Sequence, residues 1–159
     1  MNLETNSALQ ETATLVLKHG VSLGLLDGVS RQRVLALAWQ CLPHGVALTE
    51  AQVNVALRSF VDQAGAFLRT DHVELRRWLV DAGWLSRDGF GREYRSSSVE
   101  ALATPCREAA LPLAGLDVNA WAQGVRQQSQ AEALRRRLAW SERQSGAAVA
   151  ATQSKRRQR

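Results

Sequence analysis

Apolar residues recur at helical spacing in three stretches between residues 31 and 83, and polar residues fill the intervening positions. The first stretch follows Ser30, which we expect to cap a helix N-terminus, and it ends before Pro43. The second follows Thr49, which has capping-box spacing to Gln52. The predicted core positions of these two helices are Val34, Leu35, Ala38, Leu42, Val53, Leu57 and Phe60.

The third stretch predicts a helix that begins at Thr70 or Asp71 and closes at Gly83. Glu74 stands at capping-box spacing from Asp71, and acidic residues suit the first turn of a helix. The predicted core face consists of Leu75, Trp78, Leu79 and Ala82.

A β-hairpin is predicted directly after this helix. Asp88-Gly89 and Gly91 supply turn residues with positive φ between two short runs within residues 84–96. Three helices followed by a hairpin is the order of a winged helix, whose third helix enters a major groove. We therefore predict a mainly α fold with a small β-hairpin, in which residues 30–96 form a winged-helix-like domain. The aromatic residues Trp78, Trp84 and Tyr94 are assigned to its core.

The flanking segments have weaker patterns. Residues 1–29 are predicted to be an N-terminal helical extension, and 97–116, with Pro105 and Pro112, a linker. Residues 117–144 are predicted to form a C-terminal helix, and 145–159 a disordered basic tail. The apolar residues of the C-terminal helix are Val118, Trp121, Val125, Leu134 and Leu138.

The length of 159 residues fits one ordinary domain with extensions, and 45% hydrophobic and 22% charged residues are typical of soluble globular proteins. The net charge of +5 is unevenly distributed. Met1–Cys106 holds ten Lys and Arg against eleven Asp and Glu, whereas Arg107–Arg159 holds ten against four. The basic excess therefore belongs to the C-terminal extension. Because Leu15–Leu26 is too short to cross a membrane and follows no basic leader, we predict a cytoplasmic protein.

Little in the sequence indicates catalysis or metal binding. The two cysteines, Cys41 and Cys106, lie in unlike contexts and are predicted to be free thiols. Cys41 and His44 form a lone Cys-x-x-His pair, whereas a zinc site needs about four ligands. The histidines lie in separate segments without a nucleophile arrangement. We predict no metal, no cofactor and no enzyme activity.

Two blocks, TEAQVNVALRSF and DHVELRRWLVDAGWLSRDGFGREYR, resemble the bacterial domain of unknown function 2087 over about two-fifths of the chain. The family often stands alone and is also similar to segments fused behind helix-turn-helix regulators, which implies transcriptional or DNA-binding work. The lead-in VSLGLLDGVSRQR departs from the family pattern, and the long C-terminal extension lies outside it. The residues that carry the resemblance are Thr49, Glu50, Val53, Asn54 and Leu57 in one block and Asp71, Leu75, Arg76, Arg77, Leu79, Val80, Gly83, Leu85, Arg87, Asp88, Gly91, Tyr94 and Arg95 in the other.

Arginines of the third helix and the wing are the candidate DNA-contacting groups, because the guanidinium fork binds guanine or phosphate. An alternative is that Arg76 or Arg77 pairs with Asp81 or Asp88 and so locks the wing to the helix. The predicted nucleic-acid-binding residues are Arg69, His72, Arg76, Arg77, Arg87, Arg92 and Arg95. The predicted electrostatic contacts of the tail are Arg135, Arg136, Arg137, Lys155, Arg156, Arg157 and Arg159, for which a merely solvated tail is the alternative.

Two functions follow from these patterns. The first is a DNA-binding or transcription-regulatory protein that contacts double-stranded DNA through the third helix and wing. The second is a protein-interaction module without direct DNA contact, whose partner is a regulator or its own copy, with the last helix supplying the apolar contact.

Overall fold

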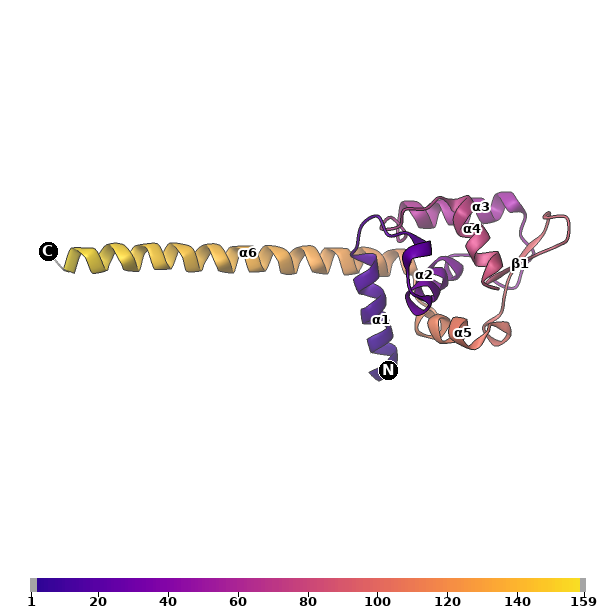
Figure 1. The fold of residues 1–159 in the computed structure, drawn as a ribbon, viewed down its shortest axis with the longest axis horizontal. Coiled ribbons are helices and arrows are strands. Elements are labelled where there is room, and N and C mark those ends of the chain that lie inside the picture. The colour runs from indigo at the N-terminus through magenta and orange to yellow at the C-terminus, as the bar shows by residue number, and fades with distance from the viewer. Residues whose placement is uncertain (1–2, 158–159) are drawn as a thin grey trace. The chain divides into compact units, whose positions relative to one another are not determined.

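The computed structural model describes residues 3–157, apart from the side chains at 3–6, 152, 154 and 155. Its central helix is α2 (Gly28–Gln40), in which every residue from Val34 to Trp39 is buried. A helical segment that is apolar all round, as residues 34–39 are, needs cover on every side. The neighbours that cover it are α1 (Leu3–Val16), α4 (His72–Asp81) and α5 (Thr104–Ala110), as Figure 1 shows.

The N-cap of α2 is Asp27, so the prediction of Ser30 as the cap is wrong. The Asp27 carboxylate accepts a hydrogen bond of 2.9 Å from the Ser30 amide. Both residues are good caps, and the helix therefore starts at the earlier one. The Asp27 cap therefore places a carboxylate at the exposed start of the central helix.

The second and third predicted helices are confirmed together with their caps. Helix α3 (Glu50–Asp62) begins with the predicted box, in which the Thr49 hydroxyl accepts from the Gln52 amide and the Gln52 side chain accepts from the Thr49 amide. Helix α4 is capped by Asp71, whose Oδ1 accepts hydrogen bonds from the Val73 and Glu74 amides. Glu74 accepts from the Thr70 hydroxyl rather than from the cap amide. The buried residues of these helices are Val53, Leu57, Phe60, Leu75 and Leu79.

The hairpin consists of β1 (Leu85–Arg87) and β2 (Tyr94–Ser96), paired antiparallel. Gly91 has the predicted positive φ, at 68°, but Gly89 does not. Leu48, just before α3, exchanges two backbone hydrogen bonds of 2.8 Å with Tyr94. Because the Tyr94 side chain is also buried, β2 is held both by the chain preceding α3 and by the core. Trp84 is fully buried, as predicted.

Helix α1 confirms the predicted helix in the N-terminal extension, and it packs against residues 30–96, which are called the module below. Leu15 and Val16 at the end of α1 are buried, whereas Leu17 is exposed. A short turn, η1 (Leu23–Leu25), follows, and Val21 bridges to Leu68. Leu15, Val16 and Leu23 therefore belong to the same hydrophobic core as α2, α3 and α4.

Residues 97–116 contain ordered helical elements where the sequence suggested a linker. These are η2 (Val99–Ala101), α5 and η3 (Leu111–Leu113). Small residues and prolines are typical of linkers, and the linker prediction is wrong here. The two prolines stand in the first turns of α5 and η3, where the missing backbone amide of proline is tolerated. The buried residues of this segment are Leu102, Cys106, Ala110 and Leu113, which form an apolar stripe at helical spacing.

The chain divides into two units, Met1–Val125 and Arg126–Arg159. Helix α6 (Val118–Arg157) begins in the first unit, where Val118 and Ala122 are buried. In the second unit the described side chains from residue 130 onward are exposed. The helix continues through 145–157, where we predicted disorder, because Ala, Gln, Lys and Arg all favour helix. None of the described helices is both long and apolar enough to cross a membrane.

Candidate nucleic-acid interface

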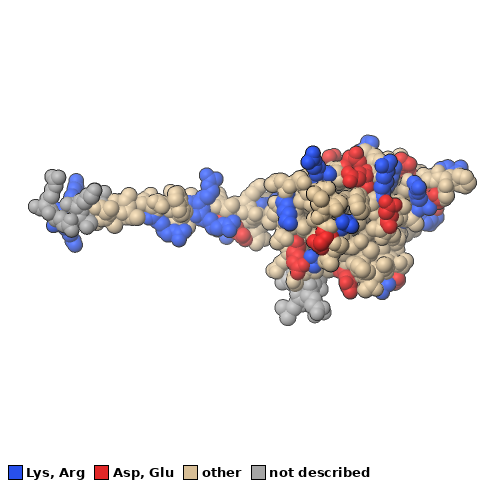
Figure 2. All heavy atoms as spheres, in the orientation of Figure 1, with Lys and Arg blue, Asp and Glu red and all other residues tan. Residues whose placement is uncertain are grey.

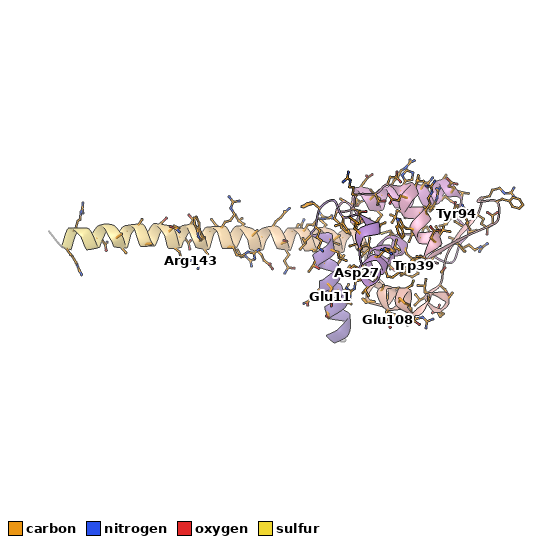
Figure 3. All side chains as sticks on the ribbon, viewed as in Figure 1. Glu11, Asp27, Trp39, Tyr94, Glu108 and Arg143 are labelled. Carbon is orange, nitrogen blue, oxygen red and sulfur yellow. The ribbon has the colours of Figure 1, made fainter. Side chains whose placement is uncertain are left out.

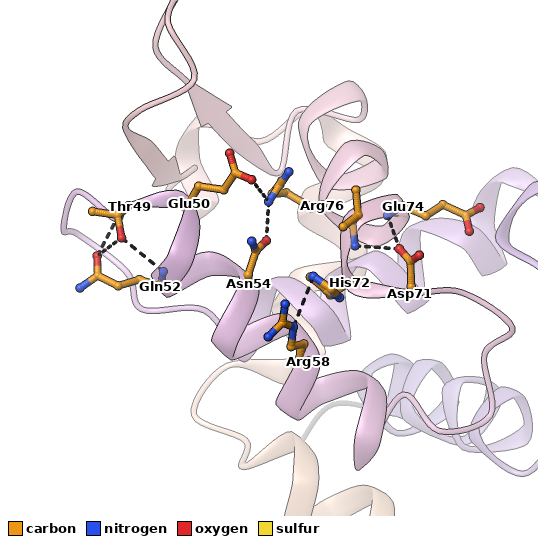
Figure 4. A network of polar contacts seen from close by, with 10 residues as sticks. Thr49, Glu50, Gln52, Asn54, Arg58, Asp71, His72, Glu74 and Arg76 are labelled. Atoms are coloured by element: carbon orange, nitrogen blue, oxygen red, sulfur yellow. Dashed lines mark hydrogen bonds and ion pairs between the residues drawn. The ribbon is translucent and has the colours of Figure 1, made fainter.

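Arg76 on α4 is engaged inside the module. Its Nη1 lies 2.9 Å from a Glu50 carboxylate oxygen and donates a hydrogen bond to the Asn54 side chain (Figure 4). Its guanidinium also lies 5.7 Å from the centre of the Tyr94 ring. With only 12% of its side chain exposed, Arg76 ties α4 to α3 and to the hairpin. An ion pair with Asp81 or Asp88 is the alternative to DNA contact that the sequence suggests. Arg76 does form an ion pair, but its partner is Glu50.

His72 lies at the start of α4 and is turned toward α3. The Arg58 Nε donates a hydrogen bond of 3.3 Å to His72 Nε2, as Figure 4 shows. This contact and the Arg76 contacts connect the two helices along their polar sides. His72 therefore already has one ring nitrogen occupied as an acceptor.

Arg77 and Arg69 are exposed, and neither has an ion pair within the described part of the chain. Arg77 has Glu74 three positions before it and Asp81 four positions after it on α4, which is the spacing of neighbours on a helix surface. These acids lower the local positive potential. Arg77 is thus accessible to phosphate, but α4 as a whole adds little net charge.

Two arginines of the hairpin, Arg87 and Arg95, do not share one face. In the hairpin register Arg87 is opposite Tyr94, and Arg95 is opposite Ser86. Opposed residues share a face and successive residues alternate, so Arg87 and Arg95 emerge on opposite faces. Arg95 also forms an ion pair of 2.7 Å with Glu93. Of these two, Arg87 is the one without an acidic partner among the described residues.

The tip of the hairpin combines an aromatic ring with an arginine. The Phe90 side chain is 81% exposed, and the Arg92 guanidinium lies 4.8 Å from the centre of its ring. The Asp88 carboxylate accepts hydrogen bonds from the Arg92 and Glu93 amides, and these bonds lower the pKa of Asp88 and fix the tip. Sequence reasoning named Arg92 but missed Phe90, although a phenylalanine between two glycines in a turn has no core to enter.

Basic side chains dominate the second unit. Figure 2 shows acidic and basic groups interspersed over the first unit, whereas basic groups prevail along residues 126–157. Lys155 and Arg159 were also predicted contacts, but the side chain of Lys155 and the whole of Arg159 lie outside the described residues. The predicted tail residues that are described and exposed are Arg135, Arg136, Arg137, Arg156 and Arg157.

Cys41 and Cys106 are free thiols, as predicted. Burial raises the pKa of Cys41 to about 11, with a smaller contribution from the Asp117 charge, and burial also raises the pKa of Cys106. The His44 ring packs edge-on against Trp39, with 4.4 Å between the ring centroids, and burial lowers the pKa of His44. The described residues contain no group of three or more side chains placed to hold a metal ion.

Residues 28–96 match the family described as "Uncharacterized protein conserved in bacteria (DUF2087)". This confirms the resemblance over the segment that contains α2, α3, α4 and the hairpin. No curated protein and no solved structure matches the chain significantly. Helices α1 and α5 lie outside the matched segment, as does α6.

Proposed function

We propose that the chain is a bacterial transcription-regulatory protein that binds double-stranded DNA, with residues 126–159 supplying most of the attraction. The observation that carries the proposal is the distribution of charge. Residues 126–159 hold nine Lys and Arg against two Glu, a net +7, whereas the net charge of +5 for the whole chain leaves −2 for residues 1–125. Phosphate attraction dominates nonspecific DNA binding, so the basic segment is the principal contact.

The arginines of this segment suit phosphates better than bases. Arg135, Arg136 and Arg137 are consecutive, and successive residues of an α-helix project about 100° apart. They therefore spread around the helix instead of forming one reading face. Contacts of this kind neutralise phosphates on both sides of a groove without selecting a sequence.

The module fixes the position of the chain on DNA more than it adds to the affinity for DNA. Its three helices and hairpin follow the order of a winged helix, with α4 in the place of the recognition helix. Its accessible cations include Arg77, Arg87 and Arg92, while Arg76 is engaged with Glu50. Phe90 at the wing tip has the exposure of an apolar wedge such as minor-groove proteins insert between bases.

Fluorescence polarisation with a labelled duplex tests this division of labour in the full chain. The variant R135Q/R136Q/R137Q should weaken binding strongly, and R77Q/R87Q/R92Q should weaken it less. The control is Lys18→Gln, which removes one exposed charge just after α1 and should leave affinity unchanged. Equal affinity of the R135Q/R136Q/R137Q variant and the original protein at low salt would refute the proposal.

A second candidate function, self-association, rests on apolar exposure in the second unit. Leu134 and Leu138 lie four residues apart on one helix face, and each is 56% exposed. In a parallel coiled coil of two copies, with these leucines in the seam, Arg137 of one helix faces Glu142 of the other. Light scattering on L134N/L138N tests this, with Trp140→Gln as a control off the seam. A monomeric original protein would exclude self-association.

A further inference from the structure

A cavity of about 700 Å³ lies in the first unit, outside the proposed DNA-contacting surface. Its walls come from α1, the start of α2, α5 and η3. This volume falls in the range typical of small-molecule sites, about 300–1,000 Å³. The apolar side chains that line it are Ala8, Val29, Pro105, Ala109, Pro112 and Leu113.

The charged groups of the cavity leave an excess of negative charge. Asp27 and Glu108 both line it, from the start of α2 and from α5. Arg33 lines it too, but its Nη2 is 2.5 Å from a Glu11 carboxylate oxygen, so this cation is already neutralised. Figure 3 labels Glu11, Asp27 and Glu108 on the three helices concerned. The Asp27 cap bond lowers the pKa of that carboxyl.

Gln32 adds an oriented polar group. Its Oε1 accepts hydrogen bonds from the buried Trp84 indole Nε1, at 2.7 Å, and from the Cys106 thiol, at 3.3 Å. These two donors identify Oε1 and fix the side-chain amide. No acceptor for the Gln32 NH₂ group lies among the described residues, and Gln32 is a cavity-lining residue. The amide therefore offers a hydrogen-bond donor to a ligand oxygen.

We propose that this cavity binds a small organic cation with an apolar body and a hydrogen-bond-accepting oxygen. The apolar walls take the body, the Asp27 and Glu108 carboxylates attract the cation, and the Gln32 amide donates to the oxygen. Most of the walls come from α1, α5 and η3, which lie outside the family-matched segment 28–96. The site is therefore a property of this chain's flanking segments and is independent of the proposed DNA contact.

The probe is N-(aminoethyl)benzamide, which carries a phenyl ring, a carbonyl oxygen and an ammonium group. N-ethylbenzamide is its neutral analogue, and hippurate is its carboxylate analogue. The readout is the Trp84 indole N–H resonance of the full chain, which reports on the hydrogen bond to Gln32 and is one of five tryptophan signals. No DNA is present, so the result does not depend on the proposed function.

The cationic probe should shift the Trp84 signal saturably, the neutral analogue should bind more weakly, and hippurate should not bind. Glu108→Gln should weaken binding of the cation about three- to fivefold, as expected for one partly exposed charge pair. Glu100→Gln, on the neighbouring η2 and outside the cavity, is the matched control and should bind as the original protein does. The absence of a saturable shift, equal binding of hippurate, or unchanged affinity of Glu108→Gln would each overturn the proposal.

Discussion

Arg76 and Arg77 are neighbours on α4, but replacing each with methionine should affect a different property: stability for Arg76 and DNA affinity for Arg77. Arg76→Met keeps an apolar stem but removes the hydrogen bond to Asn54, the ion pair with Glu50 and the contact with the Tyr94 ring. Arg77→Met removes a charge that is exposed and outside any ion pair among the described residues.

The magnitude follows from the three contacts of Arg76. A hydrogen bond to a charged group contributes about 1.5 kcal/mol. The Glu50 partner is half exposed, so its ion pair adds about 0.5 kcal/mol. The aromatic contact adds about 0.5 kcal/mol. Arg76→Met should therefore lower the free energy of unfolding by about 2–3 kcal/mol, which corresponds to a fall in Tm of roughly 10 °C for a domain of this size.

Thermal unfolding followed by circular dichroism measures the stability of both variants, and polarisation with duplex DNA measures their affinity. We expect Arg76→Met to be destabilised and, at a temperature where it is folded, to bind DNA like the original protein. Arg77→Met should keep its Tm and bind DNA slightly more weakly. An Arg76→Met protein with unchanged Tm and weakened DNA binding would show that Arg76 reaches DNA and that the α3–α4 contacts are dispensable.

Three further predictions concern packing, acid sensitivity and thiol reactivity. A Cβ at Gly65 would lie 2.6 Å from the fully buried Phe60 ring, so Gly65→Ala should cost about 1–3 kcal/mol in a urea titration, whereas Gly24→Ala, with nothing within 4 Å, should be near neutral. The amide hydrogen bonds at the start of α4 lower the pKa of Asp71 below 3.8. The ionised Asp71 therefore stabilises the folded protein above that pH, and this stabilisation is lost as pH falls through the folded-state pKa. Asp71→Asn should lose less stability than the original protein between about pH 5 and pH 2.5. Unchanged pH dependence in that variant would contradict this assignment. Because the pKa of Cys41 is about 11 rather than 9.0, the folded protein should have roughly 100-fold less Cys41 thiolate at pH 8 than an ordinary thiol, and iodoacetamide labelling should be correspondingly slow until urea is added.

The helices and their caps could be predicted because their signals are local. The Thr49–Gln52 box and the Asp71 cap each depend on residues within one turn of the chain, and the core stripes repeat at fixed spacing. The Asp27 cap was missed because Asp27 and Ser30 are both suitable cap residues, and residue type alone does not choose between them.

The contacts of the candidate interface could not be predicted, because they join distant parts of the chain. Arg76 on α4 forms its ion pair with Glu50 on α3. Only the packing of α3 on α4 selects that carboxylate over Asp81, which is nearer in the sequence. Likewise, the opposite directions of Arg87 and Arg95 follow from the hairpin register, which an Asp-Gly turn signal alone does not fix.

The ordered segment at residues 97–116 carried a signal that composition concealed. Leu102, Cys106, Ala110 and Leu113 recur at helical spacing, but alanines and prolines between them resemble a linker. The cavity depends on this segment meeting α1 and the start of α2, an encounter between three separate stretches that no local pattern encodes.

The salt dependence of DNA binding tests the central claim most directly. Polarisation titrations of a labelled duplex with the full chain, from about 50 to 200 mM salt, should give a plot of log Kobs against log salt that falls linearly, with a slope of about −0.9 for each phosphate neutralised. We predict a steep slope for the original protein and a slope shallower by up to about 2.7 units for R135Q/R136Q/R137Q, since three contacts are removed. Binding that is absent at the lowest salt, or a slope that is the same in both proteins, would contradict the claim that residues 126–159 hold the chain on DNA.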